Sequence, residues 1–547
     1  FGDATPGSYT YETYSFFNDH FGNRTAGSLR KYDIETDNAT PEMFDIIFYD
    51  ESLGTDEFEN MSKLTVTRGI ESCGIHTSLT DKDALFFSAH GGADTGYHTH
   101  YDTGAFVFDL DGVRWAEDLG KEDYNIGLAN QFIYRKRSEA HNTITINNSA
   151  AKESMTENGF APIIDHQSND RSAFVAYDMT SVFEETDKHT RGFYIGDDYR
   201  SLTVRDEIVL NQPSEVYWTM NTKANVIVNG NEAILLMNGK SLSVKVECDA
   251  EDWEFKAMPC EPLEALPKGT VDQMKNDEYT KLAVRVDSSG SFNITVKLAS
   301  TEEAAGAAAV DTTPIENWKL LDGEPQETTQ PHIDANIYAD GNLVVGDVIN
   351  VQEKGRIPEI EVEPINDGYS YEIVKSAENL DDTTEIKVYN EDKSAYKLYL
   401  FKYSDNDVEL WKNYNVLDIV SYEVSQQIQP ENAAPNMFDG DFGTRWTSLN
   451  EGEYVTVDLG SIKNICGVAM GFWQSKTRSY NYTIQVSDDG VNYRTITSGS
   501  SPLGPEEYTV YNFDPVDARY VRIIGTGNTE NVNTNILELR VLGNKEG

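Results

Sequence analysis

Short stretches of alternating apolar and polar residues dominate the chain from about residue 61 to 300, and they constrain its fold more than any other feature. Examples are Ala105–Asp109, Ser201–Leu210 and Lys281–Asp287, with turn residues recurring about every ten positions. Successive side chains of a strand point to opposite faces, so this period indicates half-buried antiparallel strands. We therefore expect a large antiparallel β-sandwich over residues 61–305.

The rest of the chain divides at changes in composition. A low-complexity stretch at 301–310 resembles a linker, and the strand signals that follow predict a small Ig-like β domain at 315–415. A further all-β unit is expected at 418–547. Residues 1–60 are aromatic-rich and irregular, with short helices expected near Ser28–Tyr32 and Met43–Tyr49. The predicted fold class is all-β, in several domains, because 547 residues exceed a single core.

The charge balance narrows the possible partners. The chain has 44 Lys and Arg against 92 Asp and Glu, a formal net charge of −48. Such an excess argues against nucleic acids and anionic membranes as partners. There is no apolar run of about 18 residues that could span a membrane. The N-terminus lacks a signal-peptide pattern, so we expect a mature product or a fragment of a soluble extracellular protein.

Four scattered cysteines give no zinc-knuckle spacing. Cys248 and Cys260 would be able to form a disulfide if they lay on adjacent strands. The sequence leaves that question open.

Three of the 9 histidines lie between positions 98 and 141, with a carboxylate among them. His98 and His100 are two apart, which on a strand places both on one face. Asp118 begins a turn after an expected strand, and His141 precedes another. Two imidazoles and a carboxylate suit zinc, although spacing alone favours separate surface or core histidines, because His-x-His is common.

Longer motifs extend this pattern. They are Gly96–Phe108, Gly112–Gly120 and Tyr134–Ile144, with a softer match at Tyr217–Thr222. Over roughly residues 62–300 the chain resembles the C-terminal β-domain of the heparinase II/III family of polysaccharide lyases. The ordered pattern His-x-His-x-Asp, Asp-x-Gly, Ala-His-Asn-Thr is specific, and the resemblance implies a zinc ion held by His100, Asp118 and His141.

The resemblance also implies β-elimination at a uronic acid. A base removes the C5 proton and the sugar linked through O4 leaves, which requires an acid and a base tuned near the working pH. His98 is then expected to face the substrate and take part in proton transfer, while zinc steadies its loop. Tyr97 is expected to contact the sugar. Arg135, in the basic run 135–137, is expected to meet a substrate carboxylate; a solvated charged turn is the alternative.

The chain departs from this family at its N-terminal side. Family lyases carry a helical toroid that supplies an Asn or His to neutralise the carboxylate and a Tyr as acid or base. Residues 1–60 resemble only the tail of such a toroid. We therefore expect the toroid, as a fragment or a separate chain of the same enzyme, to be a partner.

Residues 432–543 resemble a coagulation factor 5/8 type C (discoidin) domain, a jelly-roll that is often a carbohydrate-binding module in bacterial enzymes. The carrying motifs are Met437–Thr447, Tyr454–Gly460, Val486–Tyr493 and Ala518–Ile523. Trp473 and Arg478 are candidates for sugar contacts by residue type. The resemblance suggests a calcium site with four oxygen donors; the alternative is a turn capped by Asp side chains. The donors are Asp439, Asp441, Thr444 and Glu538.

Together these features predict the C-terminal part of a secreted bacterial polysaccharide lyase with an acidic polysaccharide substrate. Alginate is preferred, because family members of this layout often act on it. The alternatives are a lyase for heparin or heparan-type glycosaminoglycans, and a non-catalytic carbohydrate-binding protein that keeps the zinc site.

Overall fold

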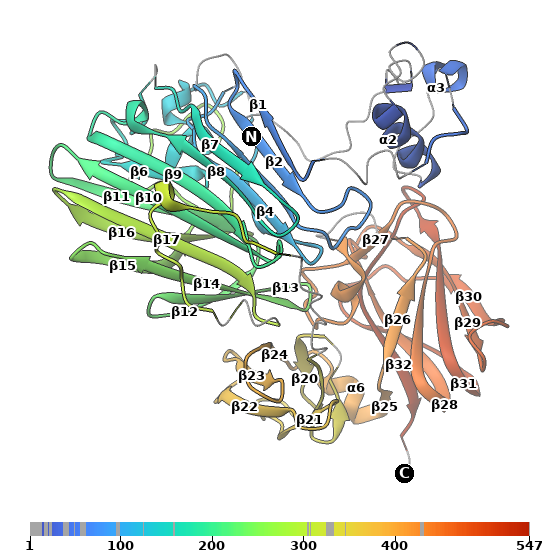
Figure 1. Ribbon diagram of the computed structural model, residues 1–547. Coiled ribbons are helices and arrows are strands. Elements are labelled where there is room, and N and C mark those ends of the chain that lie inside the picture. The colour runs from blue at the N-terminus through green and yellow to red at the C-terminus, as the bar shows by residue number, and fades with distance from the viewer. Residues whose placement is uncertain are drawn as a thin grey trace. The chain divides into compact units, whose positions relative to one another are not determined.

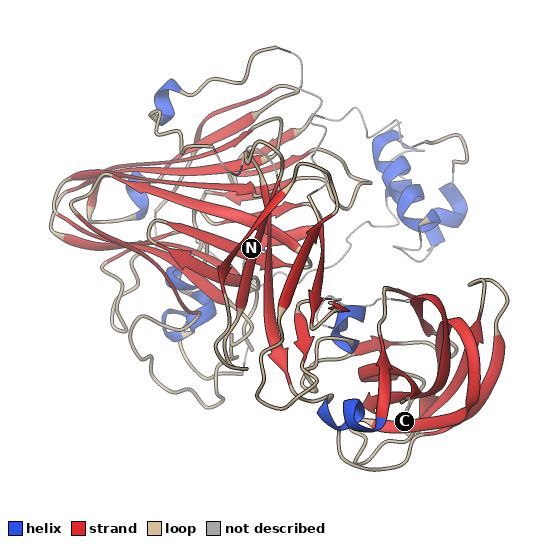
Figure 2. Cartoon of the chain, turned by 90° about the horizontal axis from the view of Figure 1, so that it is seen from below, coloured by secondary structure: helices blue, strands red, loops and turns tan. Residues whose placement is uncertain are grey.

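The structure is a computed structural model. It describes residues 14–15, 20, 24–36, 43–48, 50–54, 62–93, 99–123, 125–156, 159–302, 306, 308–323, 333–344, 346–426 and 432–545. The chain divides into two compact units, Phe1–Pro331 and His332–Gly547. Strands dominate both (Figures 1 and 2), which confirms the predicted all-β class.

The first unit contains three antiparallel sheets. One has five strands in sequence order, β1 (Leu64–Thr67), β2 (Ser72–His76), β3 (Phe86–His90), β4 (Phe106–Leu110) and β5 (Val113–Ala116). A second has eight strands in the order β12 (Asn225–Asn229), β13 (Glu232–Met237), β14 (Lys240–Cys248), β17 (Ser291–Ser300), β10 (Ser201–Leu210), β9 (Thr186–Gly196), β8 (Ala173–Asp178) and β7 (Ile163–Ser168). The third is β15 (Asp252–Pro259), β16 (Thr280–Ser288), β11 (Ser214–Thr222) and β6 (Ile144–Ile146).

One apolar core joins these sheets. Phe87 of β3 and Phe106 of β4 lie with their ring centroids 5.1 and 5.5 Å from that of Phe193 in β9. Phe106 also lies 6.3 Å from Trp218 of β11, and all four side chains are buried. Each such ring contributes roughly 1.5–3 kcal/mol through burial. The five-stranded sheet is therefore fixed against both other sheets.

Two connections of this unit carry the predicted site. The loop from β3 to β4 holds His100, and the connection from β5 to β6 holds Asp118 and His141, with short 3-10 turns η1 (Asn130–Phe132), η2 (Tyr134–Lys136) and η3 (Ser138–Ala140). The expectation that His100 lies on a strand is wrong. The N–H of Tyr101 donates to Lys136 O at 2.8 Å, so this loop binds the β5–β6 connection instead of a sheet edge.

The second unit contains two further β assemblies with separate cores. The smaller has β18 (Ala335–Ala339), β19 (Asn342–Leu343) and β21 (Ile360–Pro364) in one sheet, and β20 (Val348–Asn350), β22 (Ser370–Lys375), β23 (Thr384–Tyr389) and β24 (Tyr396–Ser404) in the other. Helix α6 (Val408–Asn413) leads into a sheet of β25 (Tyr414–Leu417), β32 (Thr534–Asn544), β28 (Tyr454–Phe472), β31 (Thr509–Asn528), β29 (Tyr480–Ser487) and β30 (Arg494–Ser500). Strand β26 (Ser421–Val424) pairs with β28, and β27 (Trp446–Ser448) with β32.

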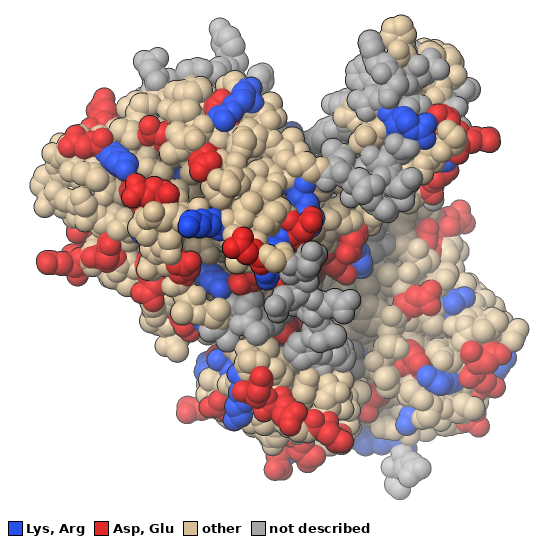
Figure 3. All heavy atoms as spheres, in the orientation of Figure 1, with Lys and Arg blue, Asp and Glu red and all other residues tan. Residues whose placement is uncertain are grey.

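The predicted helical stretches near the N-terminus are confirmed as α2 (Arg24–Glu35) and α3 (Met43–Phe48). Among the described residues, no helix is long and apolar enough to cross a membrane. Acidic side chains are spread widely over the visible face (Figure 3), as the net charge of −48 requires.

All four cysteines are free. Cys248 ends β14 and Cys260 follows β15, so the two belong to different sheets. The Cys260 thiol donates to Asn221 Oδ1 at 3.3 Å. Cys248 and Cys260 are therefore separate thiols and do not form a disulfide.

Candidate functional site

The three predicted zinc ligands lie together. His141 is fully buried, and its Nδ1 lies 2.7 Å from Asp118 Oδ2. The His100 and His141 ring centroids are 5.2 Å apart, and the rings are tilted by 45°. Asp102 is buried close by, with its Oδ1 3.3 Å from His90 Nε2 at the end of β3. These five side chains form the histidine–aspartate cluster.

Opposite charges set the protonation of this cluster. Burial alone would lower the pKa of His141, but the Asp118 carboxylate raises that pKa above its ordinary value. Burial alone would raise the pKa of Asp118, and His141 lowers it instead. The pKa of Asp102 is held well below its usual range by His90, His141 and His100, against the effect of burial. The cluster therefore favours charged carboxylates beside imidazoles.

The residue types fit zinc, which accepts two imidazole nitrogens and a carboxylate oxygen. His141 Nε2 is buried and, among the described residues, has no hydrogen-bond partner, so this nitrogen is available to a ligand. The described residues contain no group of three or more His, Cys, Asp or Glu side chains already arranged to hold a metal ion. In this structure, Asp118 accepts a hydrogen bond from His141. The zinc prediction instead requires both side chains to bind the metal.

A hydrogen-bond network holds the segment that carries His141. Asn142 Nδ2 donates to Phe106 O at 2.8 Å and to Glu117 O at 3.1 Å, and its Oδ1 accepts the Asn221 N–H at 2.7 Å. Thr219 Oγ1 donates to His141 O at 2.7 Å. The segment is thereby tied to β4, to the residue after β5, and to β11.

Sequence reasoning assigned no role to several of these groups. Asn142 and Asp102 stood within the quoted motifs, and Asn221 within the softer match, but only the fold shows what they touch. His90 lies outside every motif. Its position within the expected β-sandwich, residues 61–305, does not indicate a partner.

The basic run 135–137 is not a solvated turn, because all three side chains are buried. Arg135 Nη1 donates to Leu119 O at 2.8 Å and to Lys121 O at 3.1 Å. Its Nε and Nη2 donate to Asn276 Oδ1 at 3.0 and 2.7 Å. The guanidinium thus joins the loop after Asp118 to the segment before β16, and this arrangement favours a positioning role over a substrate contact.

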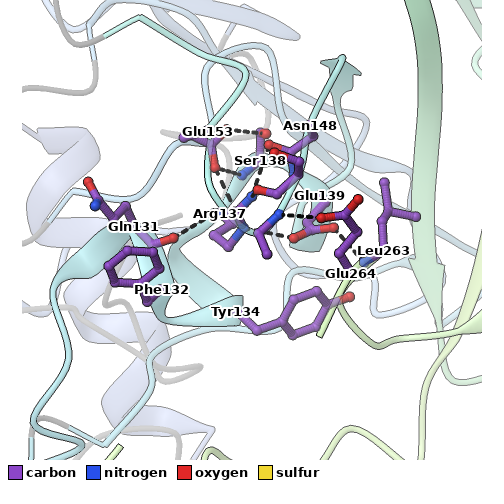
Figure 4. Close-up of polar contacts among 12 residues, drawn as sticks. Gln131, Phe132, Tyr134, Arg137, Ser138, Glu139, Asn148, Glu153, Leu263 and Glu264 are labelled. Atoms are coloured by element: carbon purple, nitrogen blue, oxygen red, sulfur yellow. Dashed lines mark hydrogen bonds and ion pairs between the residues drawn. The ribbon is translucent and has the colours of Figure 1, made fainter. Parts of the chain in front are cut away.

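Arg137 is part of a second buried network (Figure 4). Its Nε donates to Glu139 Oε1 at 2.7 Å, and its Nη2 donates to Asn148 Oδ1 at 3.0 Å. Glu139 Oε2 accepts the N–H of Leu263 at 2.7 Å. Burial raises the pKa of Glu153, which accepts a hydrogen bond from Ser138 Oγ. These contacts stabilise the connection that presents His141.

His98 and Tyr97, the predicted catalytic and sugar-contacting residues, lie outside the described residues. The neighbouring His100 is buried in the cluster. Both assignments stay predictions.

The predicted calcium ligands are brought near one another in the second unit. Thr444 Oγ1 donates to Asp439 Oδ2 at 2.6 Å, while Asp441 Oδ1 accepts the Gly443 N–H at 2.7 Å. Glu538 is buried and accepts a hydrogen bond from Tyr508 at 3.1 Å. Burial raises the pKa of Glu538 to about 8 and also raises that of Asp439. The oxygens suit calcium in type, and the calcium site stays a prediction.

Two arginines lie over one tryptophan beyond β28. Arg445 Cζ is 4.2 Å and Arg478 Cζ is 4.9 Å from the Trp473 ring centroid. Arg478 also pairs with Glu530 at 2.7 Å. Trp473 and Arg478, chosen by type, are thus neighbours, and Arg445 is a partner that the sequence did not indicate. We call these three residues the Trp473 cluster.

Family comparisons match both regions of the chain. Residues 65–296 match the model of the heparinase II/III-like C-terminal domain, and residues 421–539 match that of the F5/8 type C domain. The first region belongs to the heparinase II/III-like family. The second is an F5/8 type C domain. The chain therefore combines a lyase-related β-domain with a domain of a carbohydrate-binding type.

Several solved structures are similar to parts of the chain. A CBM32 of AlyQ in complex with 4,5-unsaturated mannuronic acid has 30% identity, covers 23% of this chain and 98% of its own, and has a TM-score of 0.23. The heparan sulfate lyase HepC from Pedobacter heparinus has 11% identity, 73% and 49% coverage and a TM-score of 0.40. The heparinase III BT4657 gene product has 14% identity, 74% and 49% coverage and a TM-score of 0.38. The chain spans about half the length of these two lyases. No curated protein matches it.

Replacing Arg135 with Ala tests the positioning role. The change leaves buried carbonyls and Asn276 without their donor, so we expect the free energy of unfolding to fall by about 3 kcal/mol, as measured by urea denaturation. Arg114→Ala is the matched control. Its side chain is 40% exposed and paired with Asp109, so the expected loss is below about 1 kcal/mol. Equal losses in both variants would argue against the positioning role.

Proposed function

We propose that this chain is the C-terminal portion of a secreted polysaccharide lyase that cleaves a uronic-acid polysaccharide, with alginate as the preferred substrate. The observation that carries the proposal is the buried cluster of His100, Asp118 and His141 inside the region that belongs to the heparinase II/III-like family. Domains of this kind are typically extracellular, which supports secretion.

The proposed reaction is a β-elimination. A base takes the proton from C5 of the uronate, the electron pair forms the C4–C5 double bond, and the C4–O bond breaks. The leaving oxygen then takes a proton. The carbanion at C5 is stabilised when its carboxylate is neutralised. We assign His98 to the proton transfer, because it precedes the fixed His100 by two residues, and a neutral imidazole is a suitable base near neutral pH.

Zinc, when bound by His100, Asp118 and His141, would supply a structural cross-link between the β3–β4 loop and the β5–β6 connection. The chain's own contacts already hold one side of this link. Asn142 and Thr219 fix the backbone at His141, and Arg135 fixes the loop that follows Asp118. On the other side, the Tyr101 N–H joins the residue after His100 to Lys136 O, and a metal bound by His100 would add a second link to the β5–β6 connection.

Metal analysis tests the proposed ligands. We expect purified protein to contain about one zinc per chain, and His100→Ala to lose most of it, because three protein ligands become two. His166→Ala is the control, since His166 is exposed on β7. Zinc content by atomic emission is the readout. Equal zinc in the wild type and His100→Ala would remove His100 from the ligand set.

Catalysis is tested in the parent enzyme that carries the toroid part. We expect His98→Ala to reduce the formation of ultraviolet-absorbing unsaturated products by about 100-fold or more on alginate, because proton transfer loses its base. The zinc content should be retained, and His166→Ala should retain activity. Heparan sulfate, hyaluronan and chondroitin complete the substrate panel. Near-normal turnover of His98→Ala would exclude His98 from the mechanism, and no elimination on any polymer would favour a non-catalytic binding protein.

We further propose that the F5/8 type C domain binds a uronate through the Trp473 cluster. Two guanidinium groups beside one aromatic ring offer charge-assisted hydrogen bonds to a carboxylate. Arg445 donates to Thr447 Oγ1 at 3.2 Å but forms no ion pair among the described residues. Its charge is therefore the one that an anionic sugar would meet.

Arg445→Ala tests this second site. We expect the affinity for an oligo-mannuronate to fall by about tenfold, because a charge-assisted hydrogen bond is lost, as measured by calorimetry. Lys476→Ala removes the same charge from an exposed neighbour and should change the affinity by less than about twofold. Equal losses of affinity in the two variants would mean that overall charge, and not the Trp473 cluster, decides the binding.

A further inference from the structure

One arginine of the F5/8 type C domain is held between two tyrosine rings. Arg522 lies on β31, and its Cζ is 4.0 Å from the ring centroid of Tyr454 and 3.7 Å from that of Tyr493. Its Nε donates to Thr456 Oγ1 at 2.8 Å. These three contacts fix the plane of the guanidinium. We call these four residues the Arg522 clamp.

Strand alternation places the Arg522 clamp on the outer face of the sheet. Thr456 of β28 and Arg522 of β31 lie directly opposite each other. Their neighbours in sequence are all buried in the core of the domain: Val455, Val457, Val521 and Ile523. Successive side chains of a strand point to opposite faces, so Thr456 and Arg522 point away from that core.

The outer edge of this guanidinium is open. Among the described residues, Arg522 Nη1 and Nη2 have no hydrogen bond and no ion pair, and neither atom is closed off from solvent. By contrast, Arg519 donates from Nε and Nη2 to the two oxygens of Asp458, at 2.7 Å each. A planar guanidinium with both Nη groups free presents parallel donors, which is the geometry that binds a carboxylate through two hydrogen bonds.

The two rings of the clamp are held by bonds of their own. Asp489 Oδ1 accepts the N–H groups of Val491 and Asn492 at 2.9 and 2.8 Å, which fixes the turn that leads to Tyr493. The N–H of Tyr454 donates to Ser425 Oγ at 2.7 Å. The clamp is therefore formed before any ligand binds, and a donor that is already fixed loses little conformational entropy on binding.

The surface around the clamp suits a sugar. Gln485 of β29 lies directly opposite Arg522, and its Nε2 donates to Thr495 Oγ1 at 3.2 Å. On the same face of β29, Thr483 Oγ1 shares a hydrogen bond with Ser498 Oγ at 2.9 Å. Amide and hydroxyl groups both donate and accept, so they match the hydroxyls of a sugar ring whose carboxylate is bound by the guanidinium.

We propose that the Arg522 clamp binds the carboxylate of a uronic-acid unit, as a contact separate from the Trp473 cluster. The identity of the sugar rests on the proposed function, and the carboxylate rests on the clamp. Trp473 O accepts a hydrogen bond from Tyr480 at the start of β29, whereas Arg522 lies opposite Gln485. Five residues of strand, roughly 16 Å, separate the two places, so one polysaccharide chain would touch the domain twice.

The test uses the full chain carrying Trp473→Ala, so that the Trp473 cluster no longer contributes. Calorimetry with a hexamer of β-1,4-linked mannuronate measures binding, and β-1,4-mannohexaose is the matched neutral ligand. We expect the mannuronate hexamer to bind, and mannohexaose to bind at least about tenfold more weakly. Arg522→Gln should weaken mannuronate binding by about tenfold, and Arg522→Lys, which keeps the charge but loses the paired donors, by about fivefold.

Arg494→Gln is the matched control, because it removes the same charge from an exposed position on β30. Its effect should be below about twofold. Tyr493→Leu removes one ring of the clamp and no charge, and should weaken binding by about threefold. Circular dichroism checks that each variant is folded. The proposal fails if the mannuronate hexamer does not bind, or if mannohexaose binds as tightly. It also fails if Arg522→Gln behaves as Arg494→Gln does, or if Arg522→Lys retains full affinity.

This measurement is independent of turnover. Elimination on alginate together with normal binding by the Arg522 variants would keep the proposed function and remove this site. Weakened binding in Arg522→Gln, with no elimination on any polymer, would keep the site and remove the lyase.

Discussion

Burial of an irregular backbone segment is the constraint on which the rest of the first unit depends. Residues 134–143 run through two short 3-10 turns, and all of them are buried. A buried segment outside a sheet has no ladder to bind its N–H and C=O groups. The 3-10 turns bind some of them through backbone bonds such as Arg137 N–H to Tyr134 O, and side chains bind others. From β11, Asn221 Nδ2 donates to Ala140 O and Thr219 Oγ1 donates to His141 O. From the segment itself, Asn142, Arg135 and Arg137 donate to carbonyls of neighbouring strands and loops. The histidine–aspartate cluster is positioned by these bonds.

The regular strands were predictable from the sequence because their signal is local. The predicted strand Ser201–Leu210 coincides with β10, where Leu202, Val204 and Ile208 are buried. The surroundings of Arg135 were not predictable. Its main partner, Asn276, is 141 residues away, and no local period reports such a contact. The charge of Arg135 suggested a contact with solvent or with the substrate. In the structure, a distant side-chain amide and two backbone carbonyls accept its hydrogen bonds inside the protein.

The candidate site was predictable in its chemistry and only partly in its geometry. The motif order indicated that His100, Asp118 and His141 belong together, and the fold brings them together. Placing His100 on a strand was wrong, because alternation cannot distinguish an edge strand from a loop that binds another loop. Arg445 was not identified beside Trp473, since the two lie on different elements and meet only through the fold.

The net charge of −48 conflicts with an acidic polysaccharide as the substrate, unless recognition is short-ranged. Charges farther apart than about 8 Å are largely screened at physiological ionic strength, so the overall repulsion weakens quickly with distance. Within that range, single arginines decide the interaction. Arg135, Arg137 and Arg540 are occupied by protein groups, whereas Arg445 lies over an aromatic ring without an ion pair among the described residues. An acidic surface with a few such arginines would exclude most polyanions and admit one whose carboxylates match their positions.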